Sequence, residues 1–238
     1  MGNQITNTIT EILSDEPYVP SEVPTQNQLN VLRELQKQLA SKPAPDCQED
    51  IALFRDLWEA AGGESGEFVL ESDFWKDRFG FQSQKPLSDV RGGGRLSLLA
   101  LQYLSKNPRG RQLLDKAQRR RDAAVTADLA SRNDEFQSYP FAPALINVVR
   151  MIAERLQVVG PHGLPAPPLE TSSSPNYHSI RNIEDFYDIV VDVMYLVDQQ
   201  FERVGAGYMG FPEVMKSVDE SLNSLLRQRA ANSLRLVC

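Results

Sequence analysis

Residues 89–97, DVRGGGRLS, place an arginine directly before three glycines and a leucine-rich segment. The guanidinium of Arg91 stays charged and presents five N–H donors in a planar fork, so it suits either a carboxylate or a phosphate. Two interpretations follow. Arg91 either closes its own turn by pairing with Asp89 or another carboxylate, or it faces outward to a partner's phosphates. The local pattern by itself favours the structural ion pair.

Neither of the two glycine-rich motifs predicts a nucleotide site within the chain. Residues 91–97 lead into a helix N-terminus, where free amides favour anions, but the Gly-Lys-[Ser/Thr] ending of a P-loop is missing. Residues 205–210, GAGYMG, match G-x-G-x-x-G but follow a long helical pattern instead of a strand. We interpret this second motif as a helix stop and a loop, and we expect no nucleotide or other cofactor.

Cysteine and histidine are too few and too scattered to predict other site chemistry. Cys47 and Cys238 cannot build a disulfide framework, and their number fits a reducing cytosol. His162 and His178 lie in a Pro/Ser-rich stretch without metal-ligand spacing. We therefore expect no metal site and no Cys–His nucleophile pair, and we predict that both histidines are solvated.

The composition is typical of a soluble globular chain: 238 residues, 41% apolar, with a net charge of −7. The acidic balance disfavours general nucleic-acid binding. The charge is uneven, however, because residues 105–121, with the basic run Lys106–Arg121, hold seven Lys or Arg against Asp115 alone. Such a run is most often a solvated helix face. Its functional alternative is a patch for acidic lipid headgroups or for an acidic protein.

The N-terminus, MGNQIT, matches the N-myristoylation pattern M-G-x-x-x-[Ser/Thr], with Gly2 as the acceptor. It lacks the basic-then-apolar build of a secretory signal, and no apolar run is long enough to cross a bilayer. One myristoyl chain gives only weak, reversible membrane affinity, so stable residence needs a second signal. The basic run Lys106–Arg121 is the candidate. We expect a cytoplasmic protein that can lie peripherally on a membrane.

Helical periodicity dominates the chain and predicts an all-α fold. Thr25 and Gln28 form a capping-box pattern, and residues 95–104 are apolar nearly all round, as in a central helix packed on several sides. The apolar residues within 183–201 recur at three- and four-residue steps. This helical period outweighs the strand preference of the β-branched residues among them. The predicted helices are one after Thr25 that ends before Pro43, then Asp46–Ala61, Ser72–Phe79, Arg95–Leu104, two that begin at Pro108 and Pro140, Ile183–Phe201, and one after Pro212.

The predicted organisation is a flexible N-terminal segment, residues 1–24, followed by one helical domain, residues 25–236. Residues 160–180 contain five prolines and a run of three serines. A segment of this composition buries little apolar surface. We predict that it forms an exposed, mobile linker inside the domain.

Residues 75–94 resemble the signature of the ELMO domain family. In that signature W-x-x-[IL]-G-F-Q is followed by P-x-[ST]-D-[FL]-R-G-x-G and a leucine-rich helix. The similarity continues at Tyr139–Val149, Phe186–Phe201 and Tyr208–Val214, and it covers roughly residues 50–218. Three departures stand out: Trp75 lies one residue farther from Gly80, Val90 replaces Phe or Leu, and Pro212 replaces a polar residue.

The resemblance implies an all-helical fold and, for the short members of this family, activation of Arf-family GTPases. It links the arginine at the position of Arg91 to that activity, as an arginine finger that acts in trans. The surface around Arg91 would then meet the GTPase, and the candidate partner-binding residues are Asp89, Gly92, Gly93, Gly94, Gly80, Phe81 and Gln82. For Phe81, a purely structural place in the core is the alternative.

Longer members of the ELMO family act as scaffolds with DOCK exchange factors through flanking domains, for which this chain is too short. Two other function classes stay open. One is a non-enzymatic helical adaptor for a small GTPase or a DOCK-type exchange factor, with Arg91 structural. The other is a myristoylated membrane-surface protein without a GTPase partner.

Overall fold

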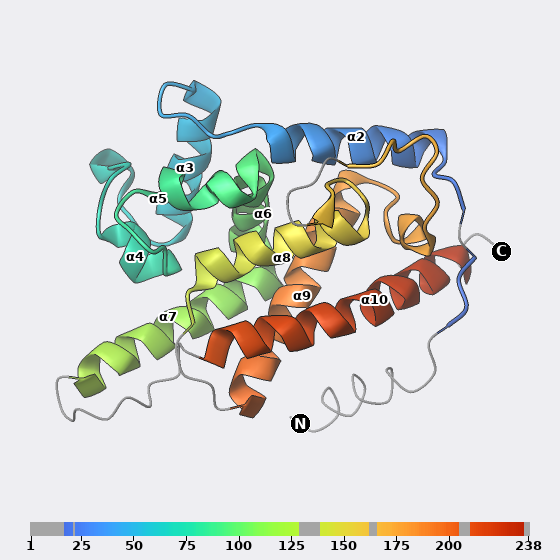
Figure 1. The fold of residues 1–238 in the computed structure, drawn as a ribbon. Coiled ribbons are helices and arrows are strands. Elements are labelled where there is room, and N and C mark those ends of the chain that lie inside the picture. The colour runs from blue at the N-terminus through green and yellow to red at the C-terminus, as the bar shows by residue number, and fades with distance from the viewer. Residues whose placement is uncertain (1–16, 21, 129–138, 162–165, 205–209, 236–238) are drawn as a thin grey trace.

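Every regular element that the computed structural model describes, over residues 17–20, 22–128, 139–161, 166–204 and 210–235, is helical (Figure 1). The α-helices are α2 (Gln26–Ala40), α3 (Gln48–Ala60), α4 (Phe74–Phe79), α5 (Pro86–Asp89), α6 (Gly94–Lys106), α7 (Pro108–Asp128), α8 (Phe141–Arg155), α9 (Ile183–Val204) and α10 (Phe211–Arg235). The 3₁₀ helices η1 (Ser65–Glu67), η2 (Val90–Gly92) and η4 (Pro175–Ser179) lie between them. The prediction of an all-α fold is confirmed.

Two predictions concern residues outside the described part of the chain. Gly2, the candidate myristoylation site, belongs to residues 1–16, and residues 205–209 contain most of the GAGYMG motif. Among the helices that the structure describes, none is both long and apolar enough to span a bilayer.

Helix α6 is the central helix of the domain. It packs against α2, α3, α7, α8 and α9, and its leucines Leu96, Leu98, Leu101 and Leu104 are buried. Each fully buried leucine contributes about 2 kcal/mol to the free energy of unfolding. Because α6 has neighbours on several sides, its sequence is apolar nearly all round.

The segment rich in β-branched residues, whose composition also suits a strand, forms helix α9. It runs without interruption over 22 residues, and Val190, Val193, Val197 and Phe201 are buried along it. These residues recur at three- and four-residue steps, so they lie on one side of a helix. That side faces α6, α7, α8 and α10, the helices against which α9 packs.

Helix α2 begins with the predicted capping box. Gln28 N donates to the Thr25 hydroxyl, and the Thr25 backbone N donates to Gln28 Oε1 at 2.8 Å. The Gln28 amide then donates through Nε2 to the carbonyl oxygen of Tyr177 at 2.6 Å. The capping box therefore also ties the start of α2 to η4.

The described part of the Pro-rich stretch, residues 166–180, is not the exposed linker that its composition predicts. Leu169, Tyr177 and Ile180 are buried, and the Tyr177 hydroxyl lies 2.8 Å from Gln157 Oε1. The η4 helix packs along α10. The prediction of exposure fails at these three residues, because each enters the core, whereas the mobility of residues 160–180 stays a prediction. His178, predicted to be solvated, is partly buried in η4.

The N-terminus of α9 is held by a carboxylate. Asp185 accepts hydrogen bonds from the backbone N–H groups of Arg181 and Asn182, at 2.8 and 3.3 Å, and from the Arg181 guanidinium. Burial by itself raises the pKa of Asp185, but the hydrogen bonds and charge of Arg181 outweigh it, so the pKa lies below its ordinary value.

The acid stability of the domain should depend on Asp185. Because the folded pKa lies below the unfolded one, the folded state binds fewer protons, and the stabilisation is present above about pH 4 and lost as the pH falls below it. Asp185→Asn should therefore lower the urea midpoint at pH 7, and the difference from the wild type should shrink toward pH 3.

The matched control is Asp115→Asn, which removes a carboxylate from an exposed pair with Arg111. This control should show a much smaller difference from the wild type at both pH values. A wild-type advantage over Asp185→Asn that stays constant from pH 7 to 3 would contradict this assignment.

Candidate functional site around Arg91

An aromatic cluster supports the segment that precedes Arg91. Trp75 is completely buried, its indole N–H donates to the Val69 carbonyl oxygen at 3.1 Å, and its ring centroid lies 5.5 Å from Phe54 and 6.3 Å from Phe81. The altered spacing to Gly80 thus leaves Trp75 in the core. Phe81 is only 4% exposed, so its side chain belongs to the core of this domain.

Gly80 ends α4 in the left-handed region, with φ of 68°. Its N–H donates to the Lys76 carbonyl oxygen at 2.9 Å. A Cβ at this position would lie 3.0 Å from the backbone N of Phe141. Both constraints come from the fold, because positive φ and close backbone packing favour glycine.

Arg121, from the basic run on α7, supports the same helix end. It donates through Nε to the Asp77 carbonyl oxygen at 3.2 Å and through Nη2 to Arg78 O and Gln118 Oε1. Burial lowers the pKa of Arg121 to about 10. A cation is favourable here because the last carbonyls of a helix carry partial negative charge.

The loop between α4 and α5 is closed by Asp89, not by Arg91. The Asp89 carboxylate accepts a hydrogen bond from the backbone N–H of Gln82 at 2.6 Å and lies 3.0 Å from the Ser88 hydroxyl. Gln82 itself is exposed. Asp89 therefore holds residues 82–89 as one turn, and its carboxylate does not pair with Arg91.

Arg91 lies on η2 and is exposed. Its Nε donates to the carbonyl oxygen of Ser88 at 3.0 Å. Within the residues that the structure describes, no carboxylate pairs with it, so the ion pair favoured by the local pattern is wrong. The hydrogen bond holds Nε in place. The two terminal nitrogens, Nη1 and Nη2, remain available to another molecule.

The structural ion pair belongs to Arg95 instead. Its Nε lies 3.2 Å from Asp50 Oδ1 and a terminal nitrogen lies 2.9 Å from Glu49 Oε2. Asp50 is 3% exposed and also accepts from the Ala44 N–H at 3.1 Å. Burial lowers the pKa of Arg95, but Glu49 and Asp50 outweigh it and raise the pKa. No local spacing indicates this pair, since its partners lie on α3.

The three consecutive glycines differ in their surroundings. Gly94 has φ of +58°, and a Cβ there would come within 2.1 Å of the Leu39 carbonyl oxygen. A Cβ on Gly93 would lie 1.7 Å from the Ser97 hydroxyl oxygen. Gly93 and Gly94 are buried, so packing within the domain accounts for both glycines, and their predicted role in partner binding stays a prediction. Gly92 is exposed, and its Cβ would meet only the Ile146 side chain, at an ordinary 3.6 Å.

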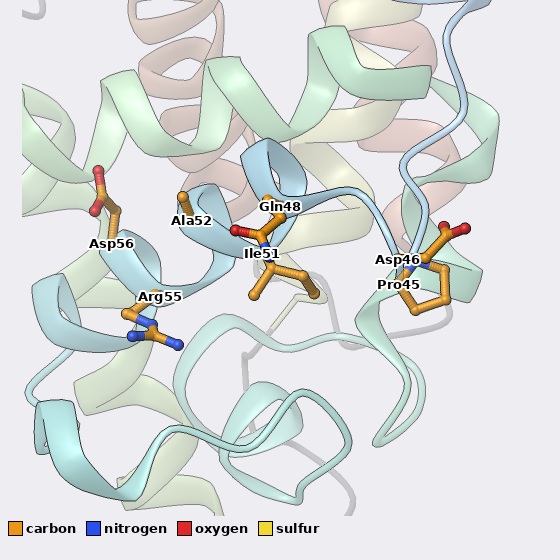
Figure 2. Close-up of a pocket in the computed structure, with 7 residues that line it drawn as sticks. All are labelled: Pro45, Asp46, Gln48, Ile51, Ala52, Arg55 and Asp56. Carbon is orange, nitrogen blue, oxygen red and sulfur yellow. The ribbon is translucent and has the colours of Figure 1, made fainter.

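Two pockets lie away from Arg91. The first, of about 520 Å³, follows the outer side of α3, with Pro45 and Asp46 at one end and Arg55 and Asp56 at the other (Figure 2). Two of its charged groups have contacts within the protein: Asp56 pairs with Lys106, and Arg55 lies over the Phe68 ring. The second, of about 850 Å³, lies between α9, α10 and the start of α7.

The basic run, from Lys106 at the end of α6 to Arg121 on α7, is mostly paired within the protein. Lys116 and Arg120 pair with Asp198 and Glu202 of α9. The other members pair or hydrogen-bond as follows: Lys106 with Asp56, Arg109 with Asp192, Arg111 with Asp115, and Arg121 with the end of α4. Arg119 is exposed. Six of the seven cations thus have a partner within the protein, but Lys106, Arg109 and Arg111 stay largely exposed, so contact of this run with a lipid surface remains a prediction.

The two arginines should differ in their effect on stability. Arg95→Met leaves the buried Asp50 without its cation, so the free energy of unfolding should fall by about 3 kcal/mol, with a Tm lower by roughly 5–10 °C. Arg91→Met removes an exposed side chain and should change the free energy by no more than about 0.5 kcal/mol. Thermal unfolding of both variants tests this contrast. An equally large loss for Arg91→Met would assign Arg91 a structural role.

Comparison with known proteins gives the family. The profile of the ELMO/CED-12 family matches residues 30–215, which include the whole Arg91 turn. ELMO domain-containing protein C of Dictyostelium discoideum is 30% identical over 187 residues, covering 76% of this chain and 26% of that protein. The chain thus spans about a quarter of that relative's length. No solved structure matches this chain. On the extent of the profile match, and with the motif residues in place, the chain belongs to the ELMO/CED-12 family.

Proposed function

We propose that this protein is a GTPase-activating protein for an Arf/Arl-family small GTPase, with Arg91 as its arginine finger. Family membership supports a role in small-GTPase regulation in general. One observation carries the finer proposal: Arg91 is exposed and anchored only through Nε, without a carboxylate partner in the described chain. An arginine that served the fold would resemble Arg95, with its two carboxylates.

In the proposed mechanism, the GTPase holds GTP and the attacking water, and this protein supplies charge. Water attacks the γ-phosphorus, the bond to the bridging oxygen breaks, and negative charge develops on the transferred group and on the leaving diphosphate. The terminal nitrogens of Arg91 donate to these oxygens. Such a residue typically contributes roughly 10³ to 10⁵ in turnover, or about 4 to 7 kcal/mol of barrier.

The surroundings of Arg91 suit this task because they hold the side chain before the partner arrives. The Nε hydrogen bond to Ser88 O restricts the side-chain torsions, and Ser88 belongs to the turn that Asp89 closes. Less conformational entropy is then lost when the guanidinium meets phosphate. In this role Asp89 positions the turn, and Arg91 alone touches the reacting groups.

We also propose that Gly2 carries a myristoyl group that brings the protein to a membrane. The support is the N-terminal sequence pattern. The basic run Lys106–Arg121 is the candidate second signal, since Lys106, Arg109, Arg111 and Arg119 present exposed cations. Intact-mass measurement of the protein from its native cell should show the added acyl chain, and an unmodified Gly2 would remove this part of the proposal.

The test of the main proposal is phosphate release from a panel of GTP-loaded Arf-family GTPases. The wild-type protein should accelerate hydrolysis by at least one of them. Arg91→Lys should lower the stimulated rate by about 10³-fold or to the intrinsic rate, because lysine keeps the charge but loses the planar fork. Its Tm should equal that of the wild type.

The matched control is Arg119→Lys, since Arg119 is also exposed but lies on α7. This control should retain full stimulation. Unchanged turnover by Arg91→Lys would remove Arg91 from the catalytic role. A wild-type protein that binds a GTPase without accelerating hydrolysis would instead be a non-enzymatic adaptor, and the activation proposal would fail.

A further inference from the structure

We infer that Gly92 is the point at which the GTPase comes into backbone contact beside Arg91, so that the missing side chain lets the finger reach its phosphate. This inference rests on the proposed function, and it assigns a partner-contact role to one glycine of the three. The other two are explained by the fold itself.

Internal requirements account for Gly93 and Gly94. Gly94 needs the left-handed backbone and sits against the Leu39 carbonyl oxygen, and Gly93 sits against Ser97. In both cases a Cβ would lie closer than 3.0 Å to an atom of the same domain. A Cβ at Gly94 must displace backbone atoms at the end of α2, and one at Gly93 must at least displace the Ser97 side chain.

No such requirement applies to Gly92. Its φ is not in the left-handed region, and a Cβ would make one ordinary contact with Ile146 at 3.6 Å. Glycine in a regular element costs roughly 0.5–1 kcal/mol relative to alanine, because the unfolded chain has more freedom to lose. The fold therefore does not require glycine at this exposed position, as it does not at Gly66, and only Gly92 has a candidate reason outside the fold.

The position next to Arg91 supplies that reason. Because Nε is held at 3.0 Å from Ser88 O, the side chain bends back over its own turn and only its end remains to reach outward. The phosphates of a bound nucleotide lie within loops of the GTPase, so the backbone that carries the finger must approach those loops closely. A side chain at position 92 would keep the two surfaces apart.

The expected result depends on the size of the side chain. Gly92→Ala should keep or slightly raise the Tm and weaken stimulation modestly, whereas Gly92→Leu should lower stimulated turnover by about 10²-fold with the Tm maintained, since displacement of a catalytic group by about 1 Å costs that much. Gly92→Leu should also weaken binding to the same GTPase loaded with GDP and aluminium fluoride.

Gly66 provides the matched control. It is an exposed glycine in the 3₁₀ helix η1, and a Cβ there would meet nothing within 4 Å. Gly66→Leu should therefore match the wild type in both stability and stimulation. Gly94→Ala is a control of the opposite kind. It should lower the Tm, because a Cβ there clashes with the Leu39 carbonyl oxygen.

The experiment uses the GTPase of the panel that the wild-type protein stimulates most. If Gly92→Leu stimulates as well as the wild type and binds the aluminium fluoride complex equally, the inference is wrong while the proposed function stands. If the wild-type protein stimulates no GTPase of the panel, both are overturned. Loss of stimulation in Gly66→Leu as well would show that the effect is not specific to position 92.

Discussion

The N-terminus of α6 lies against the C-terminal end of α2, and this contact decides where the Arg91 turn sits. The backbone N–H of Arg95 donates to the Ser41 carbonyl oxygen at 2.7 Å, and Gly94 lies so close to Leu39 that a Cβ has no room. Because α6 packs against five other helices, the turn that enters it is attached directly to the core. Figure 1 shows α3, α4 and α5 gathered at this end of the molecule.

Two arginines on either side of the glycines show how burial divides structural and candidate functional roles. Arg95 compensates the charge of Asp50, which is removed from water and would be costly without a cation. Arg91 remains hydrated, so its charge costs the fold little. In the proposed complex, it gives up water only when it meets phosphate oxygens, where the electrostatic interaction is strongest.

The rest of the domain limits movement of that turn. Asp89 joins the two ends of residues 82–89, and Arg121 reaches across from α7 to the end of α4. The aromatic cluster around Trp75 fills the space beneath. A site held in this way suits a protein that presents one preformed group to a partner, and less one that rearranges on binding.

The sequence by itself determined the helices, because the hydrogen bonds and the apolar stripe of a helix repeat over three or four residues and are written locally. The capping box at Thr25, the helical choice for α9 and the ELMO motif could all be read in this way. Tertiary structure alone decided which charges pair and which glycines are buried. Asp50 meets Arg95, and Asp198 collects Lys116 and Arg120, across separations of 45 to 82 residues. Exposure of Arg91 and Gly92, and burial of Phe81, depend on the same distant packing. No short pattern encodes them, since each is set by helices that meet only in the folded chain.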